Sequence, residues 1–170
     1  YAQAQAFAIG RAMDDVIIGA ATGTAYTGET GSTSVTLSGY NSGSQIVAAT
    51  VRSTGSGSTG LNIEKLRQAK FLMDNADVDP SIPRVIVVGP KQIQDLLATT
   101  EVTSSDFNTV KALAQGQITD FLGFTFITST RLSLNSSTDV RSCFAYAVDG
   151  VLLAVAKDLT VRIDERPDKS

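Results

Sequence analysis

The sequence contains no histidine and only one cysteine, Cys143, among its 170 residues. Without histidine, the chain alone cannot build a Ser-His-Asp or Cys-His catalytic site, a zinc site that uses imidazole, or a histidine pH switch. A single cysteine also excludes an intrachain disulfide and a cysteine-rich metal site. We therefore expect Cys143 to be a small, buried apolar residue, and a chain without disulfides suits a reducing compartment such as a cytosol.

Charge and long apolar runs are also scarce. Charged residues make up 18% of the chain and the net charge is −3, whereas a nucleic-acid-binding surface needs clustered Lys and Arg. No apolar run approaches the ~20 residues that a membrane-spanning helix requires. The hydrophobic share of 42% is enough for one domain with a core, or for part of a larger domain. Neither end carries a leader or a tail pattern, which predicts a fragment of a longer protein.

The first 21 residues have the apolar spacing of a helix. Apolar residues recur there at intervals of three and four, which places them on one helix face: Ala2, Ala6, Ile9, Met13, Val16, Ile17 and Ala20. Gly23 is a suitable end for this helix. Arg11 precedes Asp14 and Asp15 by three and four positions, so we expect local ion pairing along the helix.

Residues 22–60 differ sharply in composition from the rest of the chain. Most positions are Gly, Ser or Thr, and such a segment cannot build a core of its own. Val35 and Leu37 alternate with Thr36, and Ile46 and Ala48 lie two positions apart, which predicts two short strands joined as a hairpin across GYNSGSQ. A disordered linker is the alternative interpretation.

The next segment alternates helices and a buried strand. Asn62 is a good N-cap for a helix with Leu66 on its apolar face. The run RVIVVG, residues 84–89, is typical of a strand buried on both faces, and Pro90 suits the first turn of a short helix. A further helix is expected over about 106–114.

Strand patterns dominate the last third of the chain. Phe124 and Phe126 alternate onto one face and are expected in the core. The run SCFAYAV, the Asp149-Gly150 turn and the run VLLAVA predict a hairpin, and LTVRID predicts a third strand. The expected fold class is α+β, with helices first and an antiparallel meander later.

No motif in the sequence predicts a catalytic, cofactor-binding or metal site. Asp74, Asp77 and Asp79 lie close together, but Asp79 occupies the position where a calcium loop needs glycine, so a polar turn is expected. Gly89, Pro90 and Lys91 follow a strand, yet a phosphate loop needs several glycines, and Pro90 lacks an N–H donor. An enzyme would require the three aspartates to converge in a cleft.

The order of four segments resembles that of the major capsid proteins of tailed bacteriophages. The segments are AQAFAIGRAMDDVIIGAATGTA, LNIEKLRQAKFLMD, RVIVVGPKQIQDLLAT and LAQGQITDFLGFTFITSTRLS. The resemblance implies a phage major-capsid fold, in which a long spine helix accompanies a mixed or antiparallel sheet with flanking helices. It also implies a spine helix at 1–21, a hairpin excursion at 22–60, an axial-type domain at 61–148 and a terminal meander at 149–170, incomplete at both ends.

The resemblance further implies a structural protein, not an enzyme, that assembles into an icosahedral shell around double-stranded DNA. The implied partners are copies of the chain in hexamers and pentamers, decoration or scaffolding proteins, and DNA contacted weakly at most, with no cofactor and no membrane. The implied location is the virion, after assembly in the host cytoplasm. The candidate subunit-interface residues are Ala6, Arg11, Asp14, Asp15, Ile18, Glu101 and Asp106.

Two other interpretations remain open at this point. An encapsulin-type nanocompartment would share the fold but enclose protein cargo. A monomeric adhesin or binding module would instead use the Gly/Ser/Thr-rich hairpin for recognition, and it would show a ligand-dependent shift in stability.

Overall fold

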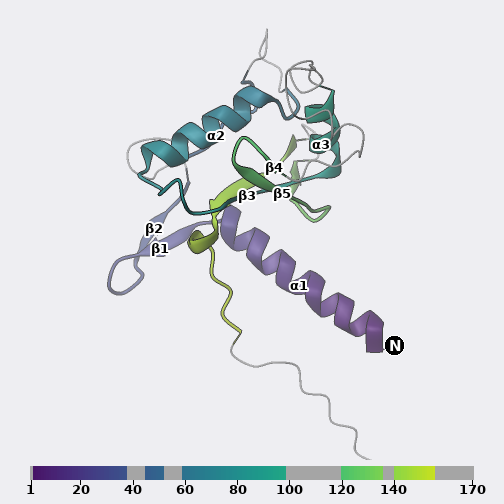
Figure 1. The fold of residues 1–170 in the computed structure, drawn as a ribbon. Helices are drawn as coiled ribbons and strands as arrows, with labels where there is room; N and C mark the ends of the chain where they lie inside the picture. Colours follow the sequence, from purple (N-terminus) through teal and green to yellow (C-terminus); the bar gives the residue numbers. More distant parts are fainter. Residues whose placement is uncertain (1, 38–44, 52–58, 99–119, 136–139, 156–170) are drawn as a thin grey trace, which may run out of the picture.

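The chain folds around a mixed sheet with helices on both faces. The computed structural model describes residues 2–37, 45–51, 59–98, 120–135 and 140–155 (Figure 1). Within them the main sheet has the strand order β4-β5-β3-β8: β4 (Asp120–Phe121), β5 (Phe124–Thr128), β3 (Arg84–Val88) and β8 (Phe144–Ala147). Strands β3 and β5 are parallel, whereas β8 pairs antiparallel with β3, and β4 pairs antiparallel with β5. The predicted α+β class is confirmed.

Three helices flank this sheet within the described ranges. Helices α2 (Ile63–Asn75) and α3 (Pro90–Leu97) cover one face, and α1 (Ala2–Thr22) meets the other face only with its C-terminal end (Figure 1). Two small two-stranded sheets, β1 (Ala25–Thr27) with β2 (Thr33–Val35) and β6 (Leu134–Asn135) with β7 (Val140–Arg141), lie outside the main one. A 3-10 turn, η2 (Val148–Gly150), follows β8.

The alternation of side chains along β3 divides the core into two parts. Ile86 and Val88 pack with residues of α2, α3 and β5 in the larger cluster, whose members include Leu66, Leu96 and Phe124. Val87 faces the opposite way and packs only with Ile18 and Leu132 among the buried residues described. All five residues of β3 are buried, as the uninterrupted apolar run predicted. The α1 side of the sheet is therefore much less covered than the α2 side.

Local capping signals in the sequence are confirmed in α2 and α3. The Asn62 side chain accepts a hydrogen bond from the Lys65 backbone N–H at 2.9 Å, and its amide donates to the Val51 carbonyl at 3.1 Å. Pro90 stands in the first turn of α3. Asn62 thus begins α2 and also ties the end of the 22–60 segment to the body.

The hairpin predicted within 22–60 does not form as two paired strands. Val35 is in a strand that pairs with Ala25–Thr27 upstream, and Ile46 to Ala48 form no strand, although the Gln45 N–H donates to the Leu37 carbonyl at 3.0 Å between the two predicted strands. The turn that joins β1 and β2 contains Gly28 and Gly31, both with positive φ, which glycine adopts at little cost. The Gly-rich sequence therefore allows an earlier turn than hydrophobic alternation suggests.

The predicted hairpin around Asp149-Gly150 is also wrong. Strand β8 pairs with β3, and residues 151–155 are extended without strand pairing among the described residues. The Asp149-Gly150 pair lies in the 3-10 turn η2, where the Val148 N–H donates to the Pro83 carbonyl at 3.0 Å. The predicted helix at 106–114 and strand LTVRID lie outside the described residues.

Replacing Gly123 by alanine is expected to destabilise the chain by about 1–2 kcal/mol, because Gly123 has φ +83 in the β4–β5 turn and alanine is strained there. Gly10→Ala is the control: Gly10 is exposed inside α1, and alanine gains about 1 kcal/mol of helix propensity. Urea unfolding of both variants measures the difference. Equal free energies of unfolding for the two variants would contradict the assigned turn.

Candidate subunit interface

Helix α1 is attached to the body through one side of its last two turns. Ile18 is buried with Val87 and Leu132, and the Thr22 hydroxyl donates to the Ile18 carbonyl at 2.9 Å near the helix end. The predicted interface residue Ile18 therefore belongs to the chain's own core and is not available to a neighbouring molecule. It anchors the helix.

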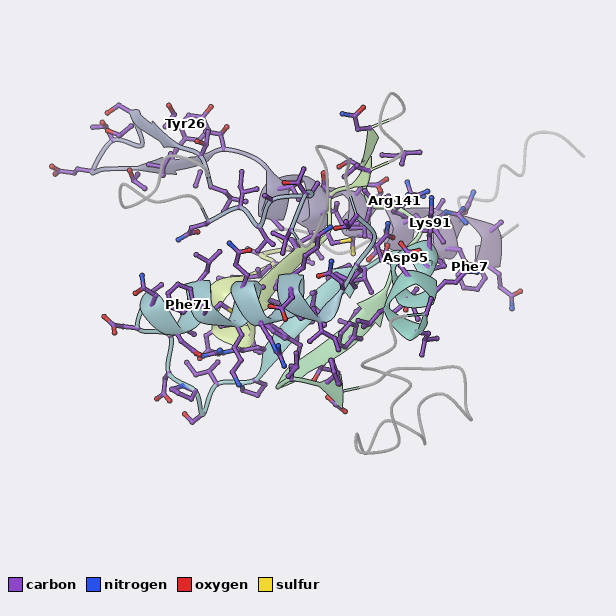
Figure 2. All side chains as sticks on the ribbon, turned by 90° about the horizontal axis from the view of Figure 1, so that it is seen from above. Phe7, Tyr26, Phe71, Lys91, Asp95 and Arg141 are labelled. Atoms are coloured by element: carbon purple, nitrogen blue, oxygen red, sulfur yellow. The ribbon has the colours of Figure 1, made fainter. Side chains whose placement is uncertain are left out.

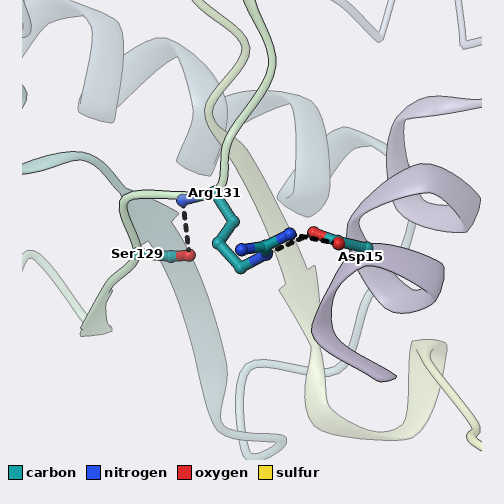
Figure 3. A network of polar contacts seen from close by, with 3 residues as sticks. All are labelled: Asp15, Ser129 and Arg131. Carbon is teal, nitrogen blue, oxygen red and sulfur yellow. Dashed lines mark hydrogen bonds and ion pairs between the residues drawn. The ribbon is translucent and has the colours of Figure 1, made fainter. Parts of the chain in front are cut away.

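A bidentate ion pair provides the second attachment of α1 (Figure 3). The Arg131 guanidinium donates through Nε and Nη2 to the two carboxylate oxygens of Asp15. These hydrogen bonds lower the pKa of Asp15 below its ordinary value, and they raise the pKa of Arg131. Asp15 thus forms a long-range pair with Arg131, whereas the sequence predicted local pairing with Arg11.

The loop that carries Arg131 is itself fixed to the sheet. The Ser129 N–H donates to the Val88 carbonyl at 2.9 Å, directly after the end of β5, and the Arg131 N–H donates to the Ser129 hydroxyl at 3.2 Å. The Arg141 guanidinium donates to the carbonyls of Thr130 and Leu132 at 3.3 and 2.9 Å. Asp15 is therefore paired with a braced side chain, which defines the direction in which α1 leaves the body.

The opposite side of α1 carries an uncovered apolar surface, which we call the outer stripe. Its members recur at intervals of three and four and point roughly opposite to Ile18, since each helical residue advances by about 100°: Ala6, Ile9, Met13, Val16 and Ala20. Val16 is 64% exposed and Met13 37%. The helix pattern predicted from the sequence is confirmed, but the described part of the chain leaves this face largely in solvent.

The outer stripe continues into a hollow at the end of α1. The hollow has a volume of about 260 Å³ and lies between the helix terminus and the β1–β2 hairpin. It is lined mostly by small or apolar residues: Ala20, Ala21, Gly23, Ala25, Val35, Thr36, Leu37 and Gln45. Ala20 belongs to both, so the hollow adjoins the end of the stripe.

Three further apolar features were not predicted from the sequence as exposed surfaces. Phe7 is exposed on the projecting half of α1 and Tyr26 is exposed on the hairpin (Figure 2). Residues 151–155 form an extended segment in which Leu152 is 92% exposed. The signal for this segment was the run VLLAV, which was interpreted as an internal hairpin strand. Its exposure adds it to the surfaces that a partner could cover.

The other candidate interface residues are placed as follows. Ala6, Arg11 and Asp14 are exposed on α1. Glu101 and Asp106 lie outside the described residues. The predicted neighbour contacts of these five residues stay predictions.

Two of the three acidic residues considered for catalysis, Asp74 and Asp79, have structural roles. The Asp74 carboxylate pairs with Arg84 at 2.6 Å, and the Asp79 carboxylate accepts the Ser81 N–H at 2.8 Å. Within the described ranges, no three His, Cys, Asp or Glu side chains come close enough to hold a metal ion. None of the helices in the described part of the chain combines the length and the apolarity needed to span a bilayer.

Cys143 is half-buried beside both core clusters, as expected for a packing residue. Burial raises the pKa of its thiol. A raised pKa keeps the thiol protonated and unreactive near neutral pH.

Asp15→Asn is expected to lower the melting temperature at pH 7, because it removes the charged partner of Arg131. The folded-state pKa of Asp15 is lowered, so its stabilising effect is present above the unfolded-state value of about 4 and is lost as the pH falls through the lower folded-state value. The difference in melting temperature from the wild type should therefore vanish at strongly acidic pH. Asp14→Asn, which removes an adjacent charge, should have a smaller effect at pH 7, and equal effects would contradict the pair.

Comparison with known proteins gives one match. A family model described as "Phage capsid protein" matches residues 1–170. No curated protein and no solved structure matches the chain. The match covers α1, the hairpin, the mixed sheet and the segment after β8 together.

Proposed function

Because this chain belongs to the phage capsid protein family, we propose that it is a major capsid protein that assembles into an icosahedral shell around double-stranded DNA. In this proposal α1 is the spine helix, residues 22–60 form the excursion, residues 61–148 form the axial-type domain and residues 149–170 form a terminal segment. Copies associate as hexamers and pentamers in the virion, after assembly in the host cytoplasm.

The observation that carries the proposal is the outer stripe. A soluble monomer gains stability when an amphipathic helix turns its apolar face toward its own core. Here Ile18 and Asp15 hold the opposite side of α1 against the body, so the face with Met13 and Val16 is turned outward. Contiguous exposed apolar surfaces of this kind mark interaction sites. Within a capsid family, contact with further copies of the chain is the interaction that this surface fits.

The charge of the chain supports only weak contact with DNA. The net charge is −3, and DNA binding depends on Lys and Arg that displace counterions from phosphates. We propose that the shell encloses DNA with few direct contacts and that subunit contacts supply the stability. Many repeated interfaces of modest strength, related by symmetry, are sufficient for this.

Electron microscopy of the full-length protein, expressed alone and together with proteins encoded beside it, tests the proposal. Closed shells of uniform diameter that contain nuclease-protected DNA are the expected result. Uniform shells that contain protein cargo and no DNA would replace the viral interpretation with a nanocompartment. A folded product that stays monomeric at high concentration, in both samples, would overturn the shell proposal and favour a binding module.

A further inference from the structure

The segment Val151–Val155 is the second uncovered apolar element on the same side of the body as α1. Its five residues are all apolar, and Leu152, Leu153 and Val155 are exposed large side chains. Figure 1 shows this segment and α1 leaving the body on the side away from α2 and then diverging. The structure therefore leaves two apolar surfaces of the same chain uncovered, one helical and one extended.

These two surfaces do not cover each other within one copy as described. The outer stripe points away from the chain's own sheet, because Ile18 and Asp15 fix the opposite side of the helix to β3 and to the Arg131 loop. The segment begins after η2, whose Val148 N–H is bonded to the Pro83 carbonyl at 3.0 Å. Both elements thus start from fixed points and run apart.

We propose that the segment Val151–Val155 of one copy docks on the outer stripe of α1 of a neighbouring copy. This inference rests on the proposed shell function and names the contact that builds the shell. Every copy carries one stripe and one segment, so a head-to-tail contact covers both surfaces on every copy. A heterologous contact of this type closes into a ring when the rotation between copies is suitable, as a capsomer requires.

The outer stripe and the segment Val151–Val155 are similar in length, and both are apolar. The stripe from Ala6 to Ala20 is about 21 Å long at 1.5 Å per helical residue, and five extended residues span about 15 Å. The segment carries no charge, so docking places no ionised group of the segment against the helix. The hollow of about 260 Å³ at the end of the stripe, lined by Ala20, Val35 and Leu37, extends the apolar receptor surface.

Cross-linking between two single-cysteine forms of the full-length protein tests the contact. Both forms carry Cys143→Ala, which removes the one cysteine of the 170 residues, and any cysteine elsewhere in the full-length protein is replaced by alanine as well. One form carries Val16→Cys or Met13→Cys and an affinity tag, and the other carries Leu152→Cys. The two forms are co-assembled and treated with a short bismaleimide, which tolerates a shift of a few ångströms in the register.

The expected result is a cross-linked dimer that contains one chain of each form. In the control, Ala8→Cys replaces the stripe cysteine: Ala8 is exposed on α1 but off the stripe, and its yield should be at least five-fold lower. Shells that form without this mixed dimer would overturn the contact but leave the shell function intact. A third form carries the stripe cysteine and Leu152→Cys in the same chain; a cross-link within this chain, without any mixed dimer of the first two forms, would also overturn the contact, because the segment would then cover its own helix. If no shells form, the inference fails together with the function on which it rests.

Discussion

Introducing glutamate at both Met13 and Val16 is expected to abolish shell formation and to leave the folded subunit intact. Both side chains lie on the outer stripe and are 37% and 64% exposed, so the substitutions remove little packing within the chain. In an assembled shell each glutamate would be buried against apolar surface without a partner, and such burial is strongly unfavourable. Repetition of the penalty at every interface of a shell makes the effect large.

Sedimentation velocity and electron microscopy measure assembly, and thermal unfolding measures subunit stability. The matched control introduces the same two charges on other sides of α1, as Gln3→Glu together with Ala8→Glu, at positions that are exposed and off the stripe. The control should assemble like the wild type. Normal shells from the stripe variant, or loss of shells from both variants, would contradict the role of the stripe.

The way in which α1 is attached to the body explains why this helix is suited to an interface. Its anchor consists of one buried side chain, Ile18, and one ion pair, Asp15–Arg131. The loop that carries Arg131 is bonded to β3 through Ser129 and to β7 through Arg141. The helix therefore has a defined direction but little of its surface covered, which leaves its apolar residues for contacts between copies.

The sequence predicted those parts of the fold that local chemistry determines. Asn62 caps α2 through its own side chain, Pro90 begins α3, and the continuous apolar run of β3 is buried throughout. Phe124 and Phe126 share one face of β5 and pack in the larger cluster, as their spacing indicated. The resemblance to phage capsid proteins is confirmed by the family match.

Strand pairing could not be predicted in the same way, because alternation identifies a strand but not its partner. Strand β8 was expected to pair with the run VLLAVA, residues 151–156, and it pairs with β3 instead. Val35 was expected to pair toward Ile46, and it pairs with Ala25. The parallel pairing of β3 with β5 depends on a connection that brings residue 124 beside residue 84, and no local pattern encodes that distance.

The orientation of α1 was not predictable for a related reason. The spacing of Ile9, Met13 and Val16 indicates an apolar helix face, but it does not show which molecule covers that face. Ile18, on the opposite side, packs against Val87 and decides the orientation. A helix whose apolar stripe and whose anchor lie on different sides is a feature that only the three-dimensional structure reveals.

Replacing Phe124 by alanine is expected to cost about 3–5 kcal/mol of the free energy of unfolding, which is a large share of the roughly 5–15 kcal/mol that a domain has. The Phe124 side chain is fully buried, at 0% exposure, in the cluster that joins β3 and β5 to α2 and α3. Ile127→Ala is the control, since Ile127 lies on the same strand but faces the other way and is 45% exposed, so its loss should cost about 1 kcal/mol. Urea unfolding measures both values. The α1 side of the sheet is thinly covered, so we expect most of the stability to come from the α2 side. Similar free-energy costs for Phe124→Ala and Ile127→Ala would contradict the assigned core.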